Sequence, residues 1–327
     1  MPRLPALAVS RRALLRGAAA TAAVAASLAA VPPAFAADKL TVLLDWFVNP
    51  DHAPLVVAAQ QGFFADEGLD VELVPPSDPA APPRLVAAGQ ADVAVTYQPS
   101  LYEQVAAEMP LARFGTLVET PLNTVIVLAD GPVKTLADLK GRTIGFSVAG
   151  FEDVLLSAML RSAGLTPADV KVINVNFALS SSVMTGAVDA VVGGYRNFEL
   201  TQMALEGKPG RAFFPEEHGV PAYDELILVA RRDRLDDPRL PRFLAAVERA
   251  ALWITNNPEA GWKSFVAANP SLDDELNARA WKDTLPRFAK RPAALDRGRY
   301  ERFATFLTEA GLIKSLPPIT DYAVELR

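Results

Sequence analysis

The 327-residue sequence predicts an α/β protein with two similar lobes, joined by a hinge, that face each other across a cleft. Short apolar runs alternate with segments of helical periodicity, which is typical of mostly parallel sheets covered by helices. This pattern restarts near residue 136, and one stretch recurs in 85–97 and 182–195. In both copies a helical segment ends at glycine, an aspartate follows three residues later, and a tyrosine follows a buried strand. Two matching lobes indicate a hinge-bending protein whose site lies between them.

Residues 1–36 are expected to be an export signal. Ser10–Leu15 contains a twin-arginine pattern, an apolar run follows over 17–31, and Pro33–Ala36 provides the small residues of a cleavage site. A membrane anchor is the alternative, but the run is shorter than the about 20 residues that a spanning helix needs. We therefore predict a periplasmic location, reached through a twin-arginine-type signal, and a mature protein that does not span the membrane.

Charge and cysteine content argue against several classes of partner and chemistry. Without the four arginines of the leader, 28 basic residues face 38 acidic ones, and the resulting net charge of −10 disfavours nucleic acid and anionic lipid as partners. The chain has no cysteine, which excludes thiol nucleophiles and iron–sulfur clusters, and its two histidines are too few for the usual zinc sites. We expect neither a metal nor a cofactor.

The first lobe is expected over 37–127, together with the returning chain 224–327. The elements predicted in its first part are strands at 39–44, 70–74, 92–96, 111–118 and 124–128 and helices at 53–67, 84–88 and 101–107. An apolar run at 223–230 predicts a strand that returns to this lobe. Helical spacing of apolar residues then continues, and helices are predicted at 240–256, 258–268, 273–284 and 297–310.

The second lobe is expected over 128–223. Its predicted elements are strands at 143–146, 170–174 and 190–192 and helices at 136–141, 151–163 and 179–185, with a further helix that starts near Glu199. Ligands of such sheets bind beyond the carboxyl ends of the strands. The side chains that follow these strands are therefore the candidates for a site.

No catalytic motif is evident in the chain. G-x-S-x-G, the P-loop and G-x-G-x-x-G are all absent. The three serines at 180–182 are better explained as a helix N-cap region than as a nucleophile. We therefore predict a binding protein rather than an enzyme.

Three aromatic residues follow strand ends at matching places. Trp46 and Tyr97 come after strands of the first lobe, and Tyr195 comes after a strand of the second. Two aromatic faces at stacking distance suit a flat heteroaromatic ring. Packing in the core or at the rim is the alternative for each residue.

Two polar groups of the second lobe could orient such a ring. Glu199, at a helix start, could accept two hydrogen bonds from an aminopyrimidine or could interact with the helix dipole. Ser147 and Gly150 bound a turn that could offer backbone N–H groups and a hydroxyl to an oxygen-rich substituent, or could simply connect strand to helix.

The first polar turn, which follows the strand 39–44, contributes two further candidates. His52 could cap backbone groups or could bind a ligand directly, and Asn49 is a second candidate. Asn123, which precedes the run 124–128, is another.

Three motifs resemble the NMT1/THI5-like family. They are 44–52 (LDWFVNPDH), 61–71 (QGFFADEGLDV) and 193–199 (GGYRNFE). The second motif is shared with binders of sulfonates, taurine and nitrate and indicates only the fold. The other two resemble the substrate-binding components of pyrimidine ABC importers. The resemblance implies a type II periplasmic binding protein.

The same resemblance implies a function in thiamine salvage. Such a protein binds N-formyl-4-amino-5-aminomethyl-2-methylpyrimidine or hydroxymethylpyrimidine and delivers it to an ABC permease in the inner membrane. We expect the mature protein to be a monomer. In the family the tyrosine and glutamate of the third motif stack on the pyrimidine and hydrogen-bond to it. They match Tyr195 and Glu199, and Asn197 lies between them. An alkanesulfonate, taurine or nitrate is the alternative cargo.

The family also contains an enzyme, the hydroxymethylpyrimidine phosphate synthase of yeast. The synthase has a lysine that binds pyridoxal phosphate and, four residues later, a histidine that is consumed as substrate. Thr96 and Ser100 occupy those positions here. The synthase also has a cysteine-rich iron motif near the strand that corresponds to 223–230, and this chain has no cysteine. We therefore disfavour this alternative.

Overall fold

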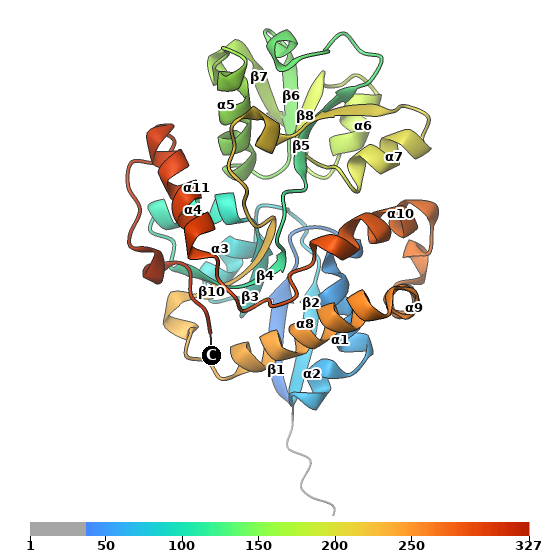
Figure 1. The fold of residues 1–327 in the computed structure, drawn as a ribbon, viewed down its shortest axis with the longest axis vertical. Coiled ribbons are helices and arrows are strands. Elements are labelled where there is room, and N and C mark those ends of the chain that lie inside the picture. The colour runs from blue at the N-terminus through green and yellow to red at the C-terminus, as the bar shows by residue number, and fades with distance from the viewer. Residues whose placement is uncertain (1–36, 327) are drawn as a thin grey trace, which may run out of the picture. The chain divides into compact units, whose positions relative to one another are not determined.

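The computed structural model describes residues 37–326, which belong to one compact unit with two lobes (Figure 1). Each lobe contains a five-stranded sheet with helices packed on it, so the predicted two-lobed α/β fold is confirmed. The predicted leader, 1–36, lies outside the described residues. Within 37–326, no helix combines the length and the apolar character that crossing a membrane requires.

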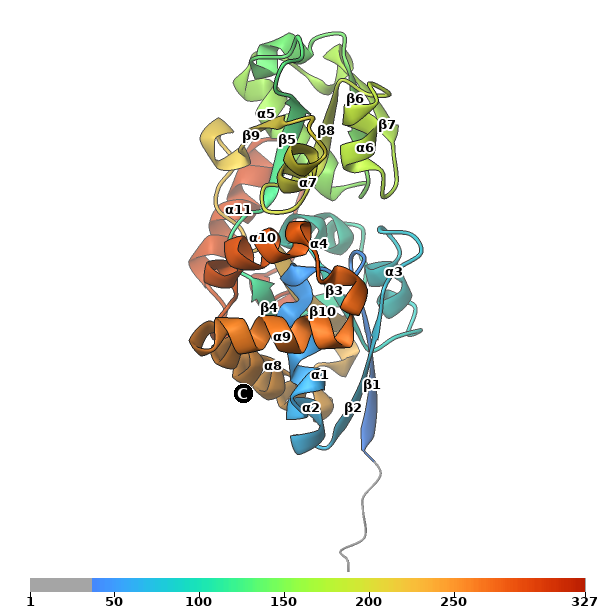
Figure 2. The same cartoon turned by 90° about the vertical axis from the view of Figure 1, so that its right-hand side faces the viewer.

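The first lobe is built on a mixed sheet. In spatial order its strands are β2 (Leu69–Val74), β1 (Asp38–Leu43), β3 (Val93–Thr96), β10 (Leu226–Arg231) and β4 (Leu111–Val118). Its helices are α1 (Ala53–Gln60), α2 (Phe63–Asp66), α3 (Pro82–Ala87), α4 (Gln98–Ala106), α8 (Arg239–Asn256), α9 (Pro258–Ala268), α10 (Glu275–Thr284) and α11 (Arg297–Glu309). Helices α8 and α9 lie over α1, as Figure 2 shows, and α8 buries a stripe that includes Phe243, Val247 and Ile254.

The second lobe repeats this arrangement with fewer helices. Its strands, in spatial order, are β7 (Lys171–Asn174), β6 (Thr143–Phe146), β8 (Ala190–Tyr195), β5 (Asn123–Leu128) and β9 (Gly210–Phe213). Its helices are α5 (Phe151–Ser162), α6 (Leu179–Met184) and α7 (Glu199–Leu205). In both sheets the second strand is parallel to its two neighbours, and the fourth is antiparallel to the third and the fifth.

The recurring Gly-x-x-Asp stretch has the same role in both lobes. Asp92 accepts a hydrogen bond from the backbone N–H of Thr41 on β1, and Asp189 accepts one from Thr143 on β6; both bonds are 2.9 Å long. Each aspartate therefore fixes the register between two parallel strands. Because β3 and β8 are placed alike, the tyrosines that follow them both lie at the carboxyl edge of their sheets.

The two lobes are joined by two crossing segments, 119–122 and 214–225. The first enters β5, which pairs with β8 and β9 in the second sheet. The boundary predicted at 127 was therefore too late, because it assigned an apolar run to the first lobe by its sequence position alone. Glu225 connects the two crossings: its carboxylate accepts backbone N–H bonds from Leu122 (2.5 Å) and Asn123 (3.0 Å).

Two local features differ from the prediction. The helix expected over 53–67 is divided at Gly62, which adopts a left-handed conformation with φ of 73°, so the chain turns between α1 and α2. Strand β9 was missed, because only two of its four residues, Ala212 and Phe213, are apolar. It is an edge strand and needs no continuous apolar run.

Arg113 on β4 is fully buried and holds the C-terminal segments against the first sheet. Its guanidinium donates to the backbone carbonyls of Pro292, Ala293, Ala294 and Val324, and to the hydroxyl of Thr116. Burying this cation is possible because carbonyl groups from distant parts of the chain accept hydrogen bonds from its two terminal nitrogens.

The substitution Arg113→Met should therefore lower the free energy of unfolding by about 3 kcal/mol or more, because several buried carbonyl groups lose their donor. Chemical denaturation of the purified protein measures the change. Arg302→Met, at an exposed position on α11, is the control and should alter stability little. Equal stability of the two variants would contradict this role for Arg113.

Candidate functional site

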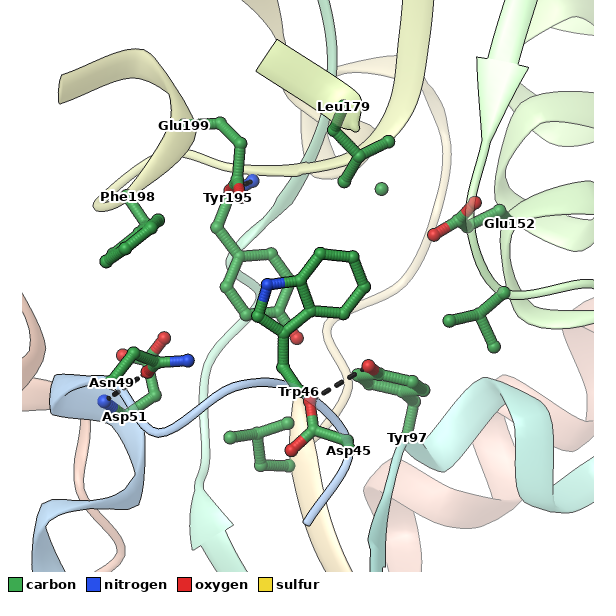
Figure 3. A pocket seen from close by; sticks show the side chains of 13 residues that line it. Asp45, Trp46, Asn49, Asp51, Tyr97, Glu152, Leu179, Tyr195, Phe198 and Glu199 are labelled. Carbon is green, nitrogen blue, oxygen red and sulfur yellow. Dashed lines mark hydrogen bonds between the residues drawn. The ribbon is translucent and has the colours of Figure 1, made fainter. Parts of the chain in front are cut away.

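A cavity lies between the two lobes, at the carboxyl edges of both sheets (Figure 3). The space between atoms there is about 450 Å³, part of which is open to solvent. The first lobe contributes the turn after β1, the residue after β3 and the start of β10; the second contributes the end of β8 and the N-terminal parts of three helices. The lining residues are Asp45, Trp46, Asn49, Asp51, Tyr97, Val148, Glu152, Leu179, Gly193, Tyr195, Phe198, Glu199 and Leu226.

The carboxylate of Asp45 organises the first-lobe side of the cavity. The hydroxyl of Tyr97 donates to Asp45 Oδ2 over 2.9 Å, and His52 Nε2 lies 2.8 Å from Asp45 Oδ1. His52 Nδ1 accepts the backbone N–H of Asn49, so the ring proton is on Nε2 and is donated to Asp45. Because both oxygens of Asp45 are used, the carboxylate holds the Tyr97 ring in place.

His52 is not available to a ligand. Its side chain is fully buried and both ring nitrogens bond within the turn, so this geometry gives no support to the expectation that it binds a ligand directly. Asn49 does line the cavity, and its side-chain oxygen caps the short 3-10 helix Pro50–His52 through the N–H of Asp51. The capping alternative for His52 is therefore the observed one.

Asp51 connects the two lobes beside the cavity. Its Oδ1 accepts from Asn197 Nδ2 of the second lobe (2.8 Å) and from Thr284 Oγ1 of α10 (2.7 Å). Asn197 also donates to Thr284, so three side chains form one buried network. Burial raises the pKa of Asp51 to about 6, against the lowering effect of these hydrogen bonds. Asn197 itself does not line the cavity, but its hydrogen bonds to Asp51 and Thr284 stabilise the cavity wall.

Tyr195 and Glu199 both line the second-lobe wall, and Glu199 begins a helix as its position in the sequence predicts. Glu199 Oε2 accepts the backbone N–H of Tyr195 over 2.7 Å, and the side chain is buried at the start of α7 (Figure 3). Burial raises the pKa of Glu199 to about 7. Near neutral pH this group can therefore act as an acceptor or as a neutral acid.

The turn 147–150 does not offer its first amide to a ligand. The backbone N–H of Ser147 donates to Glu152 Oε2 over 2.6 Å, and the Ser147 hydroxyl donates to the carbonyl of Asn176. Gly150 lies outside the lining, and its N–H donates to Asp153. The expected cradle for an oxygen-rich substituent therefore has no support at these two residues, because carboxyl groups of the same chain accept their N–H bonds.

Asn123 supports the cavity from behind. It is fully buried, and its side-chain oxygen accepts the backbone N–H of Gly193 over 3.2 Å. It therefore positions a lining residue but does not itself line the cavity, and its predicted direct contact with a ligand has no support in this geometry.

Aromatic rings close one side of the cavity. Trp46 lines it and makes an edge contact with Phe177 of the second lobe, with ring centroids 4.7 Å apart. Phe47 also stacks on Phe177 at 4.4 Å, in a tilted arrangement. Phe198, which the sequence reasoning missed, adds a further ring to the second-lobe wall.

The ionisable side chains that line the cavity are predominantly acidic. Four of its side chains are carboxyl groups, those of Asp45, Asp51, Glu152 and Glu199, and none of the lining residues is lysine or arginine. The sequence does not single out Glu152 and Asp51, because each follows a turn in which an earlier residue is the more obvious candidate for contacting a ligand. Acidic residues in the first turn of a helix are so commonly dipole partners that the pattern alone does not single them out.

Comparisons with known sequences agree with the family that the sequence motifs resemble. A profile described as NMT1/THI5 like matches residues 49–261. A Haemophilus influenzae protein named for thiamine biosynthesis is 52% identical over 295 residues, which are 90% of this chain and 94% of that protein. A formylaminopyrimidine-binding protein of Halalkalibacterium halodurans is 36% identical over 228 residues, 68% of either chain. A 4-amino-5-hydroxymethyl-2-methylpyrimidine phosphate synthase of Legionella pneumophila is 25% identical over 83% of this chain and 88% of that enzyme.

Solved structures agree on the fold. An alkanesulfonate-binding protein of Xanthomonas axonopodis has a TM-score of 0.68 at 17% identity, covering 87% of this chain and 97% of that one. A Candida albicans gene product described as having the generic periplasmic binding protein fold has a TM-score of 0.70 at 17% identity, covering 90% of this chain and 97% of that one. The fold is therefore that of a type II periplasmic binding protein.

The buried carboxyl groups predict how stability depends on pH. Burial raises the pKa of Glu199 and Glu225 to about 7 and that of Asp51 to about 6, whereas unfolding returns them to ordinary values. Between about pH 5 and pH 7 the folded state thus binds more protons than the unfolded state, so stability falls as pH rises. Thermal melting of the empty protein should give a Tm that decreases from about pH 5 to about pH 8.

Glu199→Gln removes one of these groups, so its Tm should decrease less over the same range. A Tm that rises with pH in the wild-type protein would mean that these carboxyl groups are not buried in the way described.

Proposed function

The chain belongs to the NMT1/THI5-like family, and from that premise we propose that it is the substrate-binding component of an ABC importer for a 4-aminopyrimidine precursor of thiamine. The observation that carries the proposal is the lining of the cavity: aromatic rings and four carboxyl groups, with no lysine or arginine among the lining residues. Such a lining favours a flat ring that is neutral or cationic and has N–H donors.

An aminopyrimidine has the complementary groups. Its ring can lie against Trp46 and Tyr195, which extend from opposite lobes into the cavity. Its exocyclic amine and a protonated ring nitrogen form one edge with two donors, and Glu199 can accept both. The raised pKa of Glu199, about 7, means that the acid and the pyrimidine can share a proton near neutral pH, so pairing with a basic ring offsets the cost of burying the carboxylate.

An anionic cargo is disfavoured by the same lining. A sulfonate or nitrate that leaves water needs compensating cations or several N–H donors. In the cavity it would instead meet the carboxyl groups of Asp45, Asp51 and Glu199. The structural likeness to alkanesulfonate binders concerns the fold, and the alternative cargo has no charge partner among the lining residues.

The synthase alternative is weakened by particular residues. Thr96 and Ser100, at the positions expected for the enzyme's lysine and histidine, are both buried, and neither lines the cavity. The phosphate of a pyridoxal cofactor would also need cations or an amide cradle, whereas the first amide of the turn after β6 already donates to Glu152. We therefore propose binding without turnover, with no cofactor.

The importer role rests on the relatives and the fold. One relative is named as a formylaminopyrimidine-binding protein and another is named for thiamine biosynthesis. Two lobes connected by two crossing segments can close on a ligand and so present a closed form to a permease. The proposal includes export by the leader 1–36, release into the periplasm as a monomer, and delivery of the ligand to a permease in the inner membrane.

Calorimetry tests the cargo directly. The mature protein should release heat of binding with N-formyl-4-amino-5-aminomethyl-2-methylpyrimidine or with hydroxymethylpyrimidine. It should give no heat with an alkanesulfonate, taurine or nitrate. Tight binding of one of these anions together with no response to either pyrimidine would overturn the proposed cargo.

Glu199→Gln should weaken pyrimidine binding by about 1–3 kcal/mol, because the ligand's paired donors lose one acceptor. Glu206→Gln is the matched control, because Glu206 lies at the other end of the same helix, is exposed, and accepts a hydrogen bond from the side chain of Gln202. Its affinity should equal that of the wild type. Equal affinity of both variants would restrict Glu199 to a structural role at the helix start.

A further inference from the structure

Glu152 also lines the cavity. It has no role when the amine edge of a pyrimidine pairs with Glu199. We propose that Glu152 is a second recognition group, which as a neutral acid donates a hydrogen bond from Oε1 to an oxygen atom on the ligand's polar substituent. This inference rests on the proposed function. It specifies which pyrimidines the site takes: those whose ring bears an oxygen-containing side chain away from the edge that faces Glu199.

The two oxygens of Glu152 have different surroundings. Oε2 accepts the backbone N–H of Ser147 over 2.6 Å, and a backbone N–H of Val148 also interacts with the carboxyl group. A carboxyl oxygen that accepts amide hydrogen bonds is less readily protonated than the other oxygen of the same group. Oε1 is the oxygen nearer to Gly193, and we infer that it carries the proton when the acid is neutral.

No basic side chain among the lining residues compensates a charge on Glu152. The side chain is 2% exposed, and no lysine or arginine is among the residues that line the cavity with it. Burial raises the pKa of Glu152 well above its ordinary value, and the nearby carboxyl groups of Asp153 and Glu199 add to the rise. This rise in pKa favours the neutral acid, which offers a donor to an acceptor oxygen.

The backbone of β8 is shaped around this carboxyl group. Gly193 has a φ of 101°, and a Cβ built on it would lie 2.1 Å from Glu152 Oε1. Only glycine therefore allows the carboxyl group to approach the strand so closely. Asn123 holds the N–H of Gly193 from the other side, which keeps this segment in position.

Glu152 and Glu199 are placed to contact different parts of one ligand. In Figure 3 they extend from different elements of the second lobe, and the Trp46 ring lies between them in the view. Glu199 begins α7, whereas Glu152 is the second residue of α5. A ring held at its amine edge by Glu199 can therefore direct a substituent toward Glu152.

The test compares two ligands in four proteins. The ligands are 4-amino-5-hydroxymethyl-2-methylpyrimidine and 4-amino-2,5-dimethylpyrimidine, which differ only in the hydroxyl. The proteins are the wild type, Glu152→Gln, Glu152→Met and Asp153→Asn. The last is the control, because Asp153 is the exposed neighbour of Glu152 on the same helix turn. Calorimetry gives the preference of each protein as the ratio of the two Kd values.

The wild type and Asp153→Asn should prefer the hydroxymethyl ligand by about tenfold or more. Glu152→Gln should keep most of this preference, because its amide can accept from Ser147 and donate to the ligand. Glu152→Met should lose it while still binding the dimethyl ligand. A preference that survives in Glu152→Met, or that is lost in Glu152→Gln, would overturn the proposal.

Two further outcomes remain decisive if Glu152→Met does not fold. Equal affinity of the wild type for the two ligands would by itself overturn the role of Glu152. Failure of the wild type to bind either pyrimidine would instead refute the proposed function, so the two failures are distinguishable.

Discussion

The structure of the cavity depends on how its buried carboxyl groups are stabilised without lysine or arginine among the lining residues. Backbone N–H groups bond to Glu152 and Glu199, an amide and a hydroxyl bond to Asp51, and a phenol and an imidazole bond to Asp45. Such neutral donors lower the cost of burial but do not neutralise the charge. The cavity therefore favours protons and ligands with N–H donors, and it disfavours anions.

Hydrogen bonds to buried carboxyl groups also connect the cavity to the segments that cross between the lobes. Glu225 accepts the backbone N–H of Leu122 in the first crossing segment, and Asn123, at the start of β5, accepts the backbone N–H of the lining residue Gly193. Asp51 and Asn197 join the lobes directly. Residues that close the lobes and residues that shape the site are thus neighbours in one hydrogen-bonded system. Ligand binding and lobe closure should consequently be coupled, as is usual for hinge-bending proteins.

Much of the fold was predictable because it rests on local periodicity and on a repeat. The two Gly-x-x-Asp stretches predicted matching strands, and each aspartate bonds to a neighbouring strand in the same way. The site was predictable only in part. Trp46, Asn49, Tyr97, Tyr195 and Glu199 line the cavity because they follow strand ends. His52, Ser147 and Asn123 do not, because their polar atoms bond within the chain, and such long-range partners have no signature in the local sequence.

A crystal structure of the mature protein with hydroxymethylpyrimidine would show how the cavity selects its ligand. The ring should lie between Trp46 and Tyr195, with its amine edge within hydrogen-bonding distance of Glu199. A pyrimidine bound outside this cavity, or one whose amine edge faces away from the carboxyl groups, would contradict the claim that these groups select the ligand.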